Sequence, residues 1–193
     1  MNEAKRESSD PSITFCSPRR IAINLVLYCA MWSISSFNYY LITFYMKYVP
    51  GNIYVNTTAS ALSENLAYVV SGILLNKIGI KLCYVCPLII AIVGGFLLTS
   101  IPATGWTEAS FVLIAKFGIS WSFNNCYLST PLLFPAHLRV RVFGICHLLA
   151  SFVTVLSPLL AEIEPPTPMI VFTITSGIAL VISFMINTKV KYE

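Results

Sequence analysis

The chain has 193 residues, of which 56% are hydrophobic and 10% are charged, and its net charge is +4. Its mean hydropathy is +0.77. Soluble domains carry about 25% charged residues, so this composition excludes a water-soluble globular domain and predicts an all-α integral membrane protein. The basic residues fall between apolar segments, where they report topology and give no reason to expect a nucleic-acid partner.

Six segments are apolar and long enough to cross a bilayer, which takes about 20 residues. In chain order they are Ile21–Met46, Thr57–Leu75, Leu82–Ile101, Ala109–Leu128, Val142–Ala161 and Met169–Ile186. Each link between them contains Pro, Gly or charged residues that break a helix. These links are Val49–Asn52, Asn76–Lys81, Pro102–Gly105, Pro135–Arg141 and Glu164–Pro168. The pattern predicts six transmembrane helices.

The basic residues also predict the orientation of these helices. Ten of the twelve lie in the two termini and in the second and fourth links, which share one side of the membrane. The positive-inside rule places that side in the cytosol. The first 20 residues are polar and lack the apolar stretch of a signal peptide. We therefore expect a cytosolic linker at residues 1–20, a transmembrane domain at 21–188 and a cytosolic tail at 189–193, in the plasma membrane or an endomembrane.

Two charged residues lie inside predicted helices. Glu64 and Lys116 each come eight residues after the outer start of a helix, near Asn56 and Glu108, which corresponds to a depth of about 12 Å. Charges at such depth usually face a bundle interior and pair with each other. We therefore expect Glu64 and Lys116 to pair across a polar cavity. The pair would either belong to a transport site or be a static ion pair that fixes helix packing.

The other polar residues repeat with a period of three helices. The third and sixth predicted helices are nearly free of ionisable side chains, whereas the other four carry polar ones. A three-plus-three inverted repeat around a central cavity would produce this pattern. Trp32, Tyr39 and Tyr40 suit a cation–π site for an organic cation, although aromatic residues in membrane helices more often serve packing. Motifs of hydrolases, metalloproteases and phosphate-binding enzymes are missing, so we expect no catalytic residue, no cofactor and no metal.

The stretch "GILLNKIGIK" resembles the cytosolic signature of the major facilitator superfamily, Gly-x-x-x-Asp-Arg/Lys-x-Gly-x-Arg/Lys. Four positions match, and an asparagine replaces the acidic residue; the five positions are Gly72, Asn76, Lys77, Gly79 and Lys81. "AKFGISWSF" and "LLFPAHLR" are similar to the tenth helix of the organic cation, anion and carnitine transporters, with Lys116, Tyr127, Pro135 and Arg139 at matching positions. The resemblance implies the C-terminal six-helix half of a major facilitator fold.

Residue roles follow from the same resemblance. The implied substrate-binding candidates are Trp32, Tyr39, Glu64, Lys116 and Ser151, and Pro135 and Arg139 would form a cytosolic gate. Ser151 stands where the cation carriers have Asp and the anion carriers have Arg, so the charge of the substrate stays open. Leu132 and Asn187 replace glutamates of the family pattern, which weakens the expected contacts at the gate.

Two functions follow from the resemblance. The chain is expected either to transport a small organic ion as a half-carrier or to be a truncated, non-transporting paralogue that serves as a membrane interaction protein. A half-carrier would need a second six-helix half, from another copy or from a separate chain, because these carriers bind their substrate between two halves. Its partners would be the lipid bilayer, the organic ion and that second half.

Overall fold

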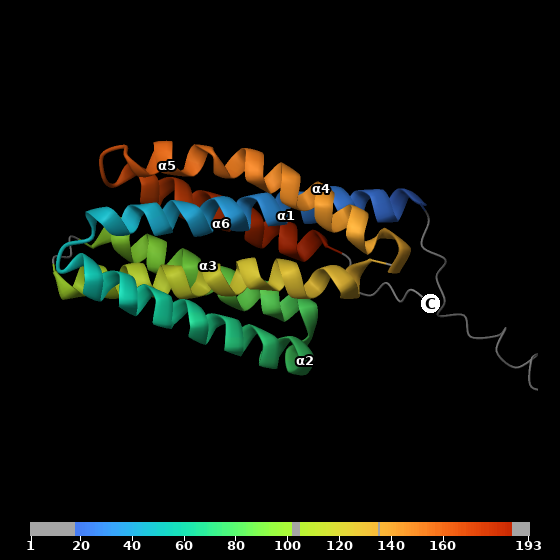
Figure 1. The fold of residues 1–193 in the computed structure, drawn as a ribbon, viewed down its shortest axis with the longest axis horizontal. Helices are drawn as coiled ribbons and strands as arrows, with labels where there is room; N and C mark the ends of the chain where they lie inside the picture. Colours follow the sequence, from blue (N-terminus) through green and yellow to red (C-terminus); the bar gives the residue numbers. More distant parts are fainter. Residues whose placement is uncertain (1–17, 102–104, 135, 187–193) are drawn as a thin grey trace, which may run out of the picture.

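The computed structural model describes residues 18–101, 105–134 and 136–186 and contains only helices there. In chain order they are α1 (Pro18–Tyr45), the short 3-10 helix η2 (Met46–Tyr48), α2 (Ile53–Ser100), α3 (Trp106–Leu133), α4 (Ala136–Thr154), α5 (Leu156–Ala161) and α6 (Thr167–Met185). They run roughly along one long axis of the molecule (Figure 1). The prediction of an all-α protein is confirmed for this part of the chain.

The longest helix, α2, reverses direction in the middle. Gly79 has φ 80° and ψ 166°, a backbone conformation that interrupts the helix and favours glycine because it has no Cβ. The ribbon turns back at this break, so residues 53–78 form a first arm and residues 80–100 form a second arm (Figure 1). The predicted link Asn76–Lys81 is therefore a break at one residue with helical residues on both sides.

Other boundaries also differ from the predicted ones. The residues of Pro135–Arg141 were expected to link two helices, but α4 already begins at Ala136. The fifth predicted helix is interrupted at Val155, so that α4 and α5 are separate. Proline explains this break, because Pro158 has no N–H to donate to the carbonyl of Thr154. At the other end of the chain, α6 begins at Thr167, and a proline in its first turn suits a helix start.

Four helical stretches are long and apolar enough to span a membrane within the described residues. They are Ala22–Tyr48, Ile53–Ser100, Ala136–Ala161 and Thr167–Met185. The second contains both arms of α2, and α3 is not among the four. The sequence of α3 has a lysine, two asparagines and several serines, which lower its hydropathy. The chain is therefore an all-helical protein with several apolar helices, and the predicted number of six spans stays a prediction.

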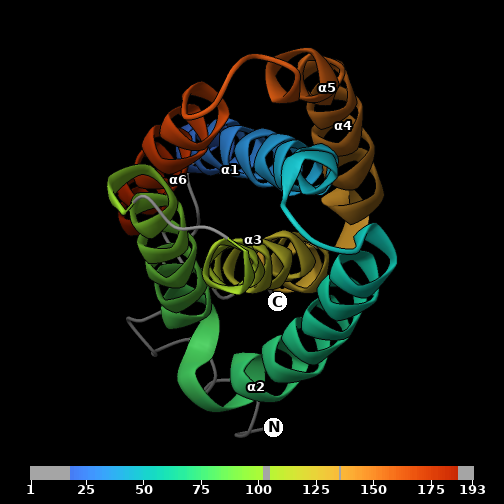
Figure 2. The same cartoon turned by 90° about the vertical axis from the view of Figure 1, so that its left-hand side faces the viewer.

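Viewed from the end, α3 lies between the two arms of α2, and α1 lies between α6 and the pair formed by α4 and α5 (Figure 2). The second arm of α2 and α3 pack backbone against backbone. A Cβ added at Gly118 would lie 2.5 Å from the backbone nitrogen of Ala91, and one added at Gly94 would lie 2.5 Å from that of Ala115. Small residues permit such close approach of membrane helices. This contact positions α3, and with it Lys116, the residue after Ala115.

Candidate functional site

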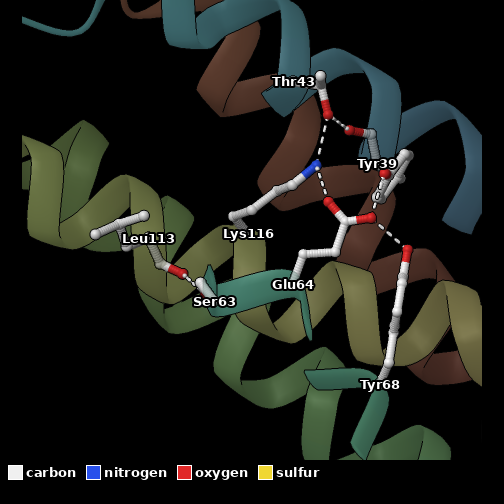
Figure 3. A network of polar contacts seen from close by, with 7 residues as sticks. All are labelled: Tyr39, Thr43, Ser63, Glu64, Tyr68, Leu113 and Lys116. Atoms are coloured by element: carbon white, nitrogen blue, oxygen red, sulfur yellow. Dashed lines mark hydrogen bonds and ion pairs between the residues drawn. The ribbon is translucent and has the colours of Figure 1, made fainter. Parts of the chain in front are cut away.

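The two charges that the sequence analysis assigned to membrane helices meet in the structure. Glu64 comes from the first arm of α2 and Lys116 comes from the middle of α3. The Nζ atom of Lys116 lies 3.5 Å from Oε2 of Glu64 (Figure 3). The predicted pairing is therefore confirmed. Each charge compensates the other, so neither is left as an uncompensated charge, which is the costliest arrangement for a buried ionisable group.

The carboxylate of Glu64 has further partners that hold it in place. The hydroxyl of Tyr39, on α1, donates a hydrogen bond of 2.5 Å to Oε1, and the hydroxyl of Tyr68 donates to the same oxygen (Figure 3). Tyr68 lies one turn after Glu64 on the same arm, where residues four apart share a helix face. Both tyrosines donate to the ionised form of the carboxylate and stabilise its negative charge.

The ammonium of Lys116 has partners on α1. It donates a hydrogen bond of 2.6 Å to Oγ1 of Thr43 and lies 3.7 Å from the centre of the Tyr39 ring. The Thr43 hydroxyl in turn donates to the backbone carbonyl of Tyr39 at 2.6 Å (Figure 3). Sequence reasoning missed both Thr43 and Tyr68. The available signal was their spacing, since each lies four residues after a predicted site residue.

The two charges differ in their exposure. The Lys116 side chain is 2% exposed, whereas the Glu64 side chain is 20% exposed. The lysine is thus enclosed by α1, α2 and α3, and Glu64 is the more exposed member of the pair. A partly open carboxylate beside aromatic rings can bind a cationic group through charge and through cation–π contacts.

A pocket of about 430 Å³ lies between α1, α3, α4 and α5, close to the pair. Tyr39 connects the two features, because its ring stacks on Phe123 with centroids 4.9 Å apart and meets the edge of Tyr40 at 5.2 Å. Phe123 and Tyr40 both line the pocket. Its full lining is Ser36, Tyr40, Phe44, Phe123, Tyr127, His147, Ser151, Thr154, Val155 and Pro158. This volume suits a small organic molecule, and the walls are mainly aromatic with a few hydroxyl groups.

The remaining predicted binding residues occupy different places. Ser151 lines the pocket from α4, where its hydroxyl donates to the carbonyl of His147 at 2.8 Å. Trp32 is fully buried and is not part of the lining. Its ring packs against Tyr127 with centroids 4.9 Å apart and against Phe143 at 5.3 Å. The structure therefore brings Tyr39, Glu64 and Lys116 together, places Ser151 across the pocket, and puts Trp32 behind Tyr127.

The predicted signature loop and gate lie away from the pair. Lys81 donates to the backbone carbonyl of Phe184 at 3.2 Å and lies over the ring of the same residue. Asn76, in the acidic position of the family signature, donates within its own helix, to the carbonyl of Gly72 at 3.4 Å. In the predicted gate, Arg139 donates from Nε to the carbonyl of Phe134 at 3.1 Å. Pro135, Asn187 and the predicted tail 189–193 lie outside the described residues, as do positions 1–17 of the predicted linker.

Apolar helices around a neutralised charge pair and an aromatic pocket are typical of a multi-pass membrane protein that binds small solutes. No protein-family model matches the chain. A Caenorhabditis elegans protein whose name provisionally assigns it as a transporter is 31% identical over 166 residues, which is 82% of this chain and 34% of that protein. Solute carrier family 22 member 4 of Mus musculus is 26% identical over 72% of this chain and 26% of its own length. Organic cation/carnitine transporter 2 of Homo sapiens is 23% identical over 80% of this chain and 28% of its own length.

The homologues of this chain are thus transporters that include members of solute carrier family 22, among them an organic cation and carnitine transporter. The predicted resemblance to that branch is confirmed. The relatives are transporters and not enzymes. The chain spans about a third or less of the length of these curated relatives.

Proposed function

We propose that this chain forms one six-helix half of a carrier that moves a small organic ion across a membrane, together with a second six-helix half. The observation that carries the proposal is the Glu64–Lys116 pair beside an aromatic pocket, in a chain whose relatives are named as transporters. The second half would come from another copy of the chain or from a separate chain.

Helix lengths support six crossings. The 48 residues of α2 would extend for about 72 Å as one straight helix, which is more than twice the roughly 30 Å of the hydrocarbon core. Divided at Gly79, each arm has about the length of one crossing. The 28 residues of α3 are also long enough, and its polar side chains are mostly buried against other helices. With α1, α6, and α4 joined to α5, this makes six.

The basic residues support cytosolic termini. The start of α1, the turn between the two arms of α2 and the start of α4 lie at the same end of the molecule (Figure 1). Lys77 and Lys81 flank that turn, and Arg139 and Arg141 lie in the first turns of α4. One end of the bundle therefore collects the basic residues, as the positive-inside rule requires of a cytosolic end.

The exposure of the pair supports an organic cation as the transported ion. Glu64 is the more exposed charge of the pair, because its side chain is 20% exposed and that of Lys116 is 2% exposed. The aromatic rings of Tyr39, Tyr40 and Phe123 continue from the carboxylate to the pocket. One relative carries "organic cation" in its name, in agreement with this chemistry.

Uptake by liposomes tests this function. The chain, alone and together with membrane extract from its source as a supply of the second half, is reconstituted and supplied with radiolabelled tetraethylammonium. We expect saturable uptake that Glu64→Gln reduces at least tenfold, because the neutral amide removes the attraction for a cation. Glu162→Gln is the matched control, since this exposed glutamate pairs with a lysine as well, Lys47 at 3.9 Å, and both side chains are exposed. Saturable uptake that is equal in the wild type and Glu64→Gln would refute the site. Absence of uptake in every preparation would favour a membrane interaction protein.

A further inference from the structure

The ammonium of Lys116 is held unequally by its three partners. Its distance to Oγ1 of Thr43 is 2.6 Å, and it lies 3.7 Å from the centre of the Tyr39 ring. Its distance to Oε2 of Glu64 is 3.5 Å. Hydrogen bonds between an ammonium and a carboxylate are normally about 2.7–2.9 Å long. The lysine is therefore drawn toward α1, and the ion pair is looser than it would be if the two charged groups met freely.

We propose that Thr43 is a positioning residue that holds Lys116 back from Glu64 and thereby keeps the Oε2 atom open to a cationic ligand. This inference rests on the proposed function, because it concerns the same binding site. It adds a residue that the sequence analysis did not single out and makes the recognition of cations depend on a hydroxyl group of α1.

The orientation of the Thr43 hydroxyl supports this role. Its hydrogen is donated to the carbonyl of Tyr39, so its oxygen is left as an acceptor, which is what an ammonium group requires. Thr43 is also exposed at the surface of the bundle. Oε1 of Glu64 already accepts from Tyr39 and Tyr68. Among the described residues, Oε2 faces only Lys116, so Oε2 is the oxygen for which a ligand cation competes.

The size of the effect follows from Coulomb's law. Without the Thr43 hydroxyl, Lys116 can approach Glu64 from 3.5 Å to about 2.8 Å. At an effective dielectric constant of about 20, this approach strengthens the attraction enough to weaken a competing cation about sevenfold. The Lys116 side chain is 2% exposed, so an anionic ligand does not compete for its ammonium, and we expect the binding of an anion not to be weakened by the same factor.

The test uses the full chain in lipid nanodiscs, with phenyltrimethylammonium as a cationic probe and benzenesulfonate as an anionic one, both measured by calorimetry. We expect Thr43→Val to raise the Kd for the cation about sevenfold and Thr43→Ser, which retains the hydroxyl, to bind like the wild type. Thr58→Val is the matched control, because Thr58 is also exposed and donates to a carbonyl in its own helix, that of Tyr54 at 2.8 Å, without touching a charge. Thr43→Ala replaces Thr43→Val if the latter elutes as aggregate.

A second measurement separates this role from a general structural effect. In a Lys116→Met background there is no ammonium to hold back, so adding Thr43→Val should leave the Kd for the cation unchanged. A wild-type chain that binds the cation with the same Kd as Thr43→Val would overturn the role of Thr43 and leave the proposed function standing. An equal loss of affinity in both backgrounds would also overturn it. A wild-type chain that binds the anion and not the cation would overturn the proposed cation site itself.

Discussion

Removing one member of the Glu64–Lys116 pair should destabilise the protein, and removing both should restore much of the loss. Two unit charges 3.5 Å apart attract each other by about 5 kcal/mol at an effective dielectric constant of about 20. Desolvation offsets much of this attraction, so the pair contributes less than the full Coulomb energy to the free energy of unfolding. Breaking a buried pair from one side nevertheless costs about 3–5 kcal/mol, because the remaining charge is left without compensation.

The two single variants should differ in size. Glu64→Gln leaves an ammonium whose side chain is 2% exposed and whose remaining partners among the described residues are the Thr43 hydroxyl and the Tyr39 ring. We expect a loss of about 3 kcal/mol in the free energy of unfolding. Lys116→Met leaves a carboxylate that is 20% exposed and still accepts from Tyr39 and Tyr68. Its loss should be smaller, about 1–2 kcal/mol, because hydrogen bonds and water compensate the remaining charge.

The assay is equilibrium unfolding in mixed micelles with increasing dodecyl sulfate, followed by circular dichroism. The wild type, both single variants and the double variant give a coupling energy, which we expect to be at least about 2 kcal/mol. The exposed pair Lys47–Glu162, at 3.9 Å and with side chains that are 65% and 70% exposed, is the control within the same chain. Its coupling should be below about 1 kcal/mol, as for other surface pairs. Additive losses for Glu64 and Lys116 would refute the reasoning.

Two further predictions concern packing and topology. Gly118→Ala should lower the folded yield sharply, because its Cβ would lie 2.5 Å from the backbone nitrogen of Ala91. Gly144→Ala should be tolerated, because no described atom lies within 4 Å of the added carbon. Size-exclusion profiles in mild detergent compare the two variants, and equal profiles would contradict the close contact. A cysteine introduced at Asn52 should react with an impermeant maleimide on intact cells. One introduced at Ile80 should react only after permeabilisation, because the distribution of basic residues predicts that Ile80 is cytosolic. The opposite labelling would reverse the orientation.

The sequence alone indicated the class of the protein and the common level of its two charges. Apolar segments of about 20 residues predict membrane helices because the bilayer sets their length. The equal distance of Glu64 and Lys116 from the outer ends of their helices predicted a common level, and the pair in the structure agrees. Gly79 within a charged stretch indicated the turn, because the backbone there takes a conformation that favours glycine.

The further partners of the two charges, beyond each other, were decided only by tertiary structure. Whether a side chain on α1 reaches Lys116 depends on the rotation of α1 about its own axis, and that rotation is set by packing against helices distant in the sequence. The structure selects Thr43 and Tyr39 for this contact and turns Trp32 toward Tyr127. The difference in exposure between Glu64 and Lys116 has the same origin. The spacing of residues along the chain predicts how deep a residue lies in the membrane. The direction in which its side chain points depends on how the helices pack in the assembled bundle.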